Sequence, residues 1–166
     1  MTRIGLLSDT HAYLDPSIID AFASCDEIWH AGDFGSIEVF ESLRRTGKIF
    51  RHVYGNIDSQ QIRIHSVETN RWRTEDMNIL MTHIGGYPGK YPATIRKMIS
   101  EVKPDLFICG HSHILRIMYD KSSDHLHLNP GACGREGFHK VRTVLRFTID
   151  QKKVEAMEVI ELGQKH

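Results

Sequence analysis

The chain has 166 residues with 21 basic and 21 acidic side chains, and 40% of its residues are hydrophobic, which is typical of one globular domain. The formal charge of zero excludes a broad basic field for extended nucleic acid, and no apolar stretch approaches the roughly 20 residues that span a bilayer. No secretory signal precedes the first strand and the three cysteines are widely spaced, so we expect a single cytoplasmic domain over 1–166.

Strands and helices alternate in the first third of the chain. A short apolar strand is predicted at 3–8, and Asp15 and Pro16 then provide the N-cap and first residue of a helix. A second strand at 27–30 is followed by a helix that Ser36 can cap and Gly47 can end, and a third strand follows at 49–54. This alternation predicts a parallel sheet covered by helices.

Hairpins are predicted in the rest of the chain. One pairs 64–73 with 77–82, and two others pair 114–119 with 125–128 and 143–149 with 154–160. Between them lie a helix at 92–102 and a buried strand at 106–109. The predicted fold class is therefore α/β, with two packed sheets flanked by helices.

Polar side chains that can bind metals follow five of the predicted strands. Ligands bind beyond the carboxyl ends of strands in open α/β sheets, and alternate residues of an extended segment point the same way. Glycine lies beside most of these positions and permits sharp turns and close approach to a ligand. The candidate metal ligands are Asp9, His11, Asp33, Asn56, His83, His111 and His113.

Seven nitrogen and oxygen ligands are too many for one tetrahedral zinc site, which takes four. They suit two divalent ions about 3.5–4 Å apart that share a carboxylate. Imidazole and carboxylate without thiolate favour manganese, iron or zinc over copper. We expect two manganese ions, with iron, zinc and nickel as the alternatives.

The residues resemble the calcineurin-like metallophosphoesterases, and most closely their small single-domain bacterial and archaeal phosphodiesterase branch. The motifs D-x-H, G-D, G-N-x-[DE], a histidine before glycine and G-H-x-H occur here in that order, from Asp9 to His113. The resemblance implies a four-layer α/β/β/α sandwich. It also implies that Asp9, His11 and His113 bind one metal, that Asn56, His83 and His111 bind the other, and that Asp33 bridges both.

The same resemblance implies hydrolysis of small phosphodiesters by a hydroxide that the two metals share. Asn56, Asp58 and His83 are the expected catalytic residues, with Asp58 orienting a ligand or water, and Arg135 is the expected contact to the substrate phosphate. Ile57 departs from the family pattern, because many members have a histidine there that protonates the leaving group. His127 and His139 are candidates for that role.

Other functions stay open at this point. Retromer-type scaffold proteins share the fold without catalysis, and a phosphomonoesterase would use the same ligands. The filled set of seven positions favours the enzyme over the scaffold. The expected partner is a small phosphodiester, with no extended nucleic acid and no membrane, and a homodimer or higher homo-oligomer is left open.

Overall fold

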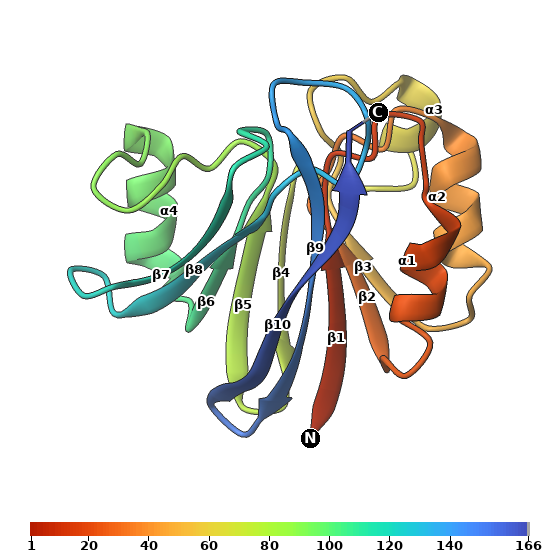
Figure 1. The fold of residues 1–166 in the computed structure, drawn as a ribbon. Coiled ribbons are helices and arrows are strands. Elements are labelled where there is room, and N and C mark those ends of the chain that lie inside the picture. The colour runs from red at the N-terminus through yellow and green to blue at the C-terminus, as the bar shows by residue number, and fades with distance from the viewer. Residues whose placement is uncertain (166) are drawn as a thin grey trace.

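The structure is a computed structural model that describes residues 1–165, and Figure 1 shows its ten strands in two facing sheets. The first sheet has the order β10 (Lys153–Gln164), β9 (Val141–Asp150), β1 (Thr2–Leu7), β2 (Glu27–His30) and β3 (Ile49–His52). Strands β1, β2 and β3 are parallel, whereas β9 is antiparallel to both β1 and β10. The predicted βαβ alternation therefore forms three of its five strands.

The second sheet has the order β4 (Thr69–Thr74), β5 (Met77–Thr82), β6 (Leu106–Ile108), β8 (His125–Pro130) and β7 (Leu115–Asp120). The hairpins β4–β5 and β7–β8 are antiparallel, and β6 joins them through parallel pairs with β5 and β8. Two of the three predicted hairpins are thus the two ends of this mixed sheet, and the third is the β9–β10 pair of the first sheet.

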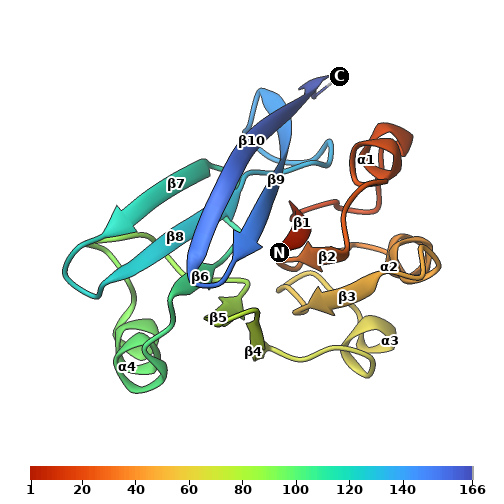
Figure 2. The same cartoon turned by 90° about the horizontal axis from the view of Figure 1, so that it is seen from below.

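Helices cover the outer face of each sheet, as Figures 1 and 2 show. Helices α1 (Pro16–Ala21), α2 (Ile37–Arg44) and α3 (Gln60–Arg63) lie beside the first sheet, and α4 (Ala93–Val102) lies beside the second. None of the helices among residues 1–165 is long and apolar enough to cross a membrane. The order helix, sheet, sheet, helix confirms the predicted four-layer α/β/β/α sandwich.

Side-chain alternation along β1 explains how the layers hold together. Ile4 and Leu6 are buried between the two sheets with Trp29 of β2, whereas Leu7 faces the helices and packs with Phe22 beyond α1. A third cluster packs Ile95 and other residues of α4 on the outer face of the second sheet. Each face of β1 is therefore buried, which accounts for its nearly continuous apolar sequence.

The structure differs from the sequence prediction mainly between β3 and β4. Residues 64–73 were predicted as one strand, but β4 begins only at Thr69 and the preceding turn of helix is α3. Ile62 of α3 is buried, and the Arg63 side chain donates to the backbone carbonyl of Asp58 at 2.8 Å. These contacts fold α3 back against the loop that follows β3, so the chain does not enter β4 as an extended segment.

Candidate metal centre

The loops that follow β1 and β2 meet those that follow β5 and β6 at one end of the sandwich. In the first sheet, the backbone amide of Asp9 donates to the carbonyl of Gly32 at 3.0 Å. In the second, the amide of Gly110 donates to the carbonyl of His83 at 3.0 Å. The amide of His111 then donates to Oδ2 of Asp9 at 3.1 Å, which joins the two sets of loops.

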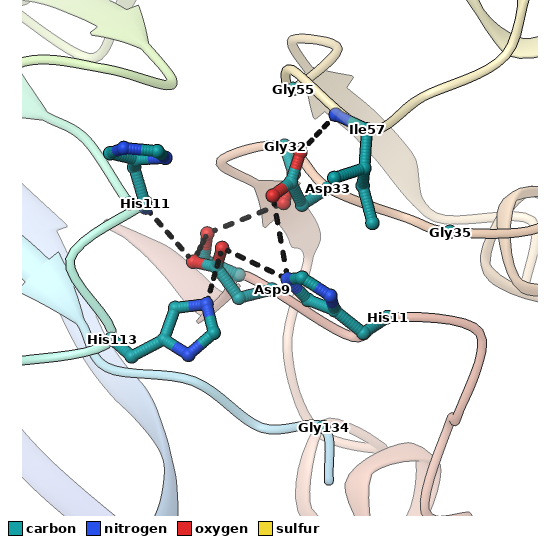
Figure 3. A network of polar contacts seen from close by, with 12 residues as sticks. Asp9, His11, Gly32, Asp33, Gly35, Gly55, Ile57, His111, His113 and Gly134 are labelled. Atoms are coloured by element: carbon teal, nitrogen blue, oxygen red, sulfur yellow. Dashed lines mark hydrogen bonds and ion pairs between the residues drawn. The ribbon is translucent and has the colours of Figure 1, made fainter. Parts of the chain in front are cut away.

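The seven candidate ligands lie together in this region. Two groups have ligand atoms that all lie within 4.8 Å of one another, namely Asp9, His11 and His113, and Asp33, His83 and His111. The seventh residue, Asn56, has its Oδ1 3.0 Å from Nδ1 of His111 and so adjoins the second group. Figure 3 shows Asp9 and Asp33 near the centre, with His11, His111 and His113 around them.

Each of the two carboxylates has one oxygen held by the protein and one oxygen directed at histidines. Asp9 Oδ2 accepts from the Ser8 hydroxyl at 2.7 Å, and its Oδ1 lies 3.2 Å from Nε2 of His113. Asp33 Oδ1 accepts from the amide of Ile57 at 3.1 Å, as Figure 3 shows, and its Oδ2 faces histidine from both groups. Those contacts join Asp33 Oδ2 to Nε2 of His83 at 3.1 Å and to Nε2 of His11 at 3.4 Å.

Three buried polar atoms in this cluster have no hydrogen-bond partner: Oδ1 of Asp9, Nε2 of His11 and Nε2 of His83. Nδ1 of His83 lies 2.7 Å from the carbonyl of Ala31 and must donate to it, so a neutral His83 turns its Nε2 lone pair toward Asp33. Lone pairs and carboxylates that face each other without solvent are unfavourable unless a cation lies between them. The donor set and its orphaned atoms therefore fit divalent metal ions.

When no metal is bound, protons on the histidines balance part of the negative charge of the two carboxylates. The neighbouring carboxylates of Asp33 and Asp9 raise the pKa of His11 to about 9. Burial opposes ionisation of Asp33, but the nearby imidazoles of His11 and His83 outweigh it and lower the pKa of this carboxyl far below its usual range. The pocket thus binds positive charge at neutral pH even before a metal enters.

The backbone of the candidate ligands is unusual. Five of the seven have left-handed φ angles between 45° and 69°, a region that non-glycine residues rarely occupy and where Asp, Asn and His are the best tolerated side chains. Such conformations cost about 1–3 kcal/mol each and persist where the surrounding structure holds them. The five residues are Asp9, His11, Asp33, His111 and His113.

Asp58, an expected catalytic residue, is buried beneath the loops and holds them together. Its Oδ2 accepts from the amides of Gly55 at 2.8 Å and Asp33 at 3.1 Å, and its Oδ1 accepts from Gly35 at 2.9 Å. The carboxylate thus fixes the position of Asp33 relative to the loop that bears Asn56. Neighbouring Ile57 has a side chain that is 46% exposed and carries no proton to transfer.

The other predicted participants lie at different distances from the cluster. The guanidinium of Arg135 stacks on the Tyr13 ring at 3.7 Å and donates to the Tyr13 hydroxyl at 2.9 Å. Arg135 follows Gly134, whose amide donates to the carbonyl of Asp9, so it lies beside the first group. His127 instead contacts Tyr91 and Cys109 in a separate buried cluster, which excludes it as an acid for the leaving group.

His139 has a structural relation to the cluster that the sequence did not reveal. Its Nε2 lies 2.8 Å from the carbonyl of Gly134 and donates to it, so its Nδ1 accepts from Nδ1 of His113 at 3.3 Å. This chain of hydrogen bonds leaves the lone pair of His113 Nε2 directed at Asp9. His139 therefore sets the tautomer and orientation of His113.

We expect His139→Ala to lower metal affinity about 10- to 100-fold, because the ring of His113 loses its fixed tautomer. The protein is first freed of metal with a chelator, the chelator is removed, and isothermal titration calorimetry with Mn²⁺ measures this loss of affinity. The control is His65→Ala, which removes an exposed histidine that no candidate ligand contacts. Equal affinity in the two variants would contradict the role of His139.

Comparison with known proteins identifies the family. The model of the calcineurin-like phosphoesterase superfamily domain matches residues 2–152. The chain belongs to this family. The motif resemblance is thereby confirmed, and the metal-dependent chemistry of the family agrees with the two groups of candidate ligands described above.

Individual members of the family and of its fold are similar along most of the chain. A protein of Methanocaldococcus jannaschii named as a probable metallophosphoesterase is 34% identical over 78% of this chain and 67% of its own length. A phosphodiesterase of the same organism is 26% identical over 79% of this chain and 84% of its own. The crystal structure of Vps29 from Chaetomium thermophilum is 12% identical and superposes with a TM-score of 0.77, over 99% of this chain and 100% of that one.

Proposed function

We propose that this metallophosphoesterase is a phosphodiesterase that hydrolyses small phosphodiesters with two divalent metal ions, manganese being the expected metal. The observation that carries the proposal is the set of unpartnered buried atoms on Asp9, His11 and His83, which face one another from both sheets. The relative from Methanocaldococcus jannaschii that is named a phosphodiesterase supports the choice of diesters.

The proposed assignment of ligands follows the two groups. Asp9, His11 and His113 hold one ion and His83, His111 and Asn56 hold the other, while Asp33 faces histidines of both groups. When bound, such a pair of ions polarises phosphoryl oxygens and lowers the pKa of a bound water. In this proposal Asn56 and His83 act on the reacting phosphate only through the ion that they would hold, because Nδ1 of His83 donates to the carbonyl of Ala31 and its Nε2 faces Asp33.

The protein's own residues then keep the site in order. Asp58 accepts from the backbone amide of Asp33, and the amide of Ile57 donates to the Asp33 side chain, so both parts of this residue are fixed. His139 fixes the ring of His113. Arg135 supplies a guanidinium beside the first group that can turn from Tyr13 to a phosphate oxygen. Since Ile57 cannot protonate a leaving group, we expect preference for diesters with acidic leaving groups, where general acid help of about 10²–10⁴-fold is not needed.

The three cysteines are buried and free, which supports a reducing compartment. We propose accordingly that the chain works in the cytoplasm as one metallophosphoesterase domain.

The Vps29 likeness keeps a second candidate in view, a non-catalytic scaffold of the same fold. One experiment decides between the two. The protein is stripped with a chelator, and hydrolysis of bis-p-nitrophenyl phosphate is followed after addition of Mn²⁺, Ni²⁺, Zn²⁺ or Mg²⁺ in turn. The phosphodiesterase proposal expects no turnover without metal and restored turnover with Mn²⁺. If no ion restores turnover, the phosphodiesterase proposal is wrong and the scaffold function takes its place.

A further inference from the structure

His30, the last residue of β2, is a fully buried histidine that is not among the candidate metal ligands. An imidazole that only filled space in the core would leave its nitrogens without partners, which costs free energy. Both nitrogens of His30 instead have partners. The partners lie in the two turns that carry Asp9 and Asp33, so the ring connects these turns.

The first partner is a backbone amide in the turn after β2. Gly32 donates its N–H to Nδ1 of His30 at 3.0 Å, and Gly32 directly precedes Asp33. Because Nδ1 accepts this bond, the ring hydrogen must lie on Nε2. Burial agrees with this neutral form, since it lowers the pKa of His30 to about 3. The bond therefore fixes the peptide that leads into Asp33.

The second partner is the hydroxyl of Thr10 in the turn after β1. Nε2 of His30 donates to Oγ1 of Thr10 at 3.0 Å, and Oγ1 donates in turn to the carbonyl of Phe34 at 3.0 Å. Thr10 is fully buried and lies between Asp9 and His11, two candidate ligands of the first group. The turn that carries both ligands is therefore held from two sides.

The two turns also contact each other through their backbones. The amide of His11 donates to the carbonyl of Asp33 at 3.1 Å, beside the bond from Asp9 to Gly32, and Figure 3 shows these residues close together. Asp9 and Asp33 both have the left-handed backbone, which persists only where surrounding contacts hold it. The ring of His30 supplies such contacts to both turns at once.

We propose that His30 is a positioning residue that sets the separation of the two metal sites, an inference that rests on the proposed function. Its bond to Thr10 acts on two ligands of the first group, and its bond from Gly32 acts on Asp33, which faces both groups. Loss of either bond lets one turn shift relative to the other. A shared carboxylate tolerates such a shift poorly, because it must reach two ions about 3.5–4 Å apart.

The main test is His30→Phe, which removes both hydrogen bonds and keeps an aromatic ring where His30 stacks on Phe34 at 3.8 Å. We expect the affinity of the metal-free protein for Mn²⁺ to fall about 10- to 100-fold in isothermal titration calorimetry. We also expect a change in the electron paramagnetic resonance spectrum at saturating Mn²⁺. The wild type should show an exchange-coupled pair of ions, and the variant should show isolated ions in its place.

His52→Phe is the matched control. His52 pairs with His30 across β2 and β3, and its ring is hydrogen-bonded to the Ser66 hydroxyl at 2.7 Å, not to either ligand turn. Its replacement also removes one imidazole hydrogen bond and should lower the melting temperature. The control should keep the wild-type affinity and the wild-type spectrum, which a loss of stability alone does not change.

Two further variants of His30 separate its two bonds. His30→Asn places an acceptor near the Nδ1 position for Gly32, whereas His30→Gln places a donor near the Nε2 position for Thr10. We expect each to lose less affinity than His30→Phe, although both lack the ring. Thr10→Val removes the same bond as His30→Asn, so the double variant should lose less affinity than the sum of the two single losses.

Wild-type affinity and a wild-type spectrum in folded His30→Phe protein would overturn the positioning role while the phosphodiesterase stands. If His30→Phe does not fold, wild-type affinity in both His30→Asn and His30→Gln would overturn it, and so would additive losses in the double variant. Wild-type protein that binds no divalent ion would overturn the proposed function together with the positioning role.

Discussion

Asp33→Asn should reduce metal-dependent hydrolysis of bis-p-nitrophenyl phosphate about a thousandfold or more. The substitution keeps the shape of the side chain, and Oδ1 can still accept from the amide of Ile57. It removes the negative charge on the oxygen that faces His11 and His83 of the two groups. Metal ions contribute several kcal/mol of transition-state stabilisation, and each 1.36 kcal/mol is a factor of ten in rate.

The measurement is kcat/KM with saturating Mn²⁺, together with a thermal melt that verifies folding. Asp76→Asn is the matched control, because Asp76 lies in the exposed turn between β4 and β5, where it pairs with Arg73 at 3.0 Å. The control should retain the wild-type rate. Near-normal rates in a folded Asp33→Asn protein would remove the shared carboxylate from the mechanism.

Gly55→Ala should reduce kcat/KM about a hundredfold although it adds one methyl group outside the ligand set. An ideal Cβ at Gly55 would lie within 2.3 Å of the backbone nitrogen of Asp33 and closer still to its Oδ1. Either Asp33 or the loop that bears Asn56 must therefore move. A displacement of about 1 Å in a catalytic group is enough for a hundredfold loss.

Gly47→Ala separates this effect from general destabilisation. Gly47 follows α2, has a φ of 73°, and a Cβ there would meet no atom within 4 Å. A left-handed alanine costs about 1–2 kcal/mol, comparable with the overpacking cost of about 1–3 kcal/mol at Gly55. Both variants should melt earlier, but only Gly55→Ala should lose activity. If both keep full activity, the close contact with Asp33 is unimportant for catalysis.

The sequence predicted the layers of the fold because they depend on local patterns. Apolar periodicity distinguished β1, β2 and β3 from α1 and α2, and two of the predicted hairpins are the two ends of the second sheet. Strand neighbours were not predictable in the same way. The pairing of β1 with β9, and the parallel position of β6 between the hairpins, depend on contacts between distant segments.

The helix α3 was missed for a related reason. Its four residues are too few to show a helical period, and its position depends on contacts that Arg63 makes with the carbonyls of Asp58 and Asn56. The alternation of apolar Ile62 and Ile64 with polar Arg63 and His65 is instead typical of a strand.

The candidate ligands could be selected from the sequence because motifs place them at strand ends, and the structure brings all seven together. Their role as ligands stays a prediction that the metal experiments test. Of the residues that support them, Asp58 was selected from its motif, whereas Ser8 was not selected and His139 was selected only as an acid for the leaving group. Ser8 and His139 act through single hydrogen bonds to Asp9 and His113, and neither belongs to a motif. Only the short distance of Ser8 from Asp9 along the chain gave any signal.

The left-handed backbone at Asp9, His11, Asp33, His111 and His113 limits how this chain can change during evolution. A replacement residue at these positions must first be able to adopt the left-handed backbone conformation, whatever its side-chain chemistry. Glycine and asparagine adopt it at the lowest energetic cost. β-branched replacements would disturb the loops of both sheets and be removed by selection for folding. We therefore expect a lineage that lost catalysis to carry glycine and asparagine at these positions. Its loops would keep the left-handed backbone conformation even without the metal ligands.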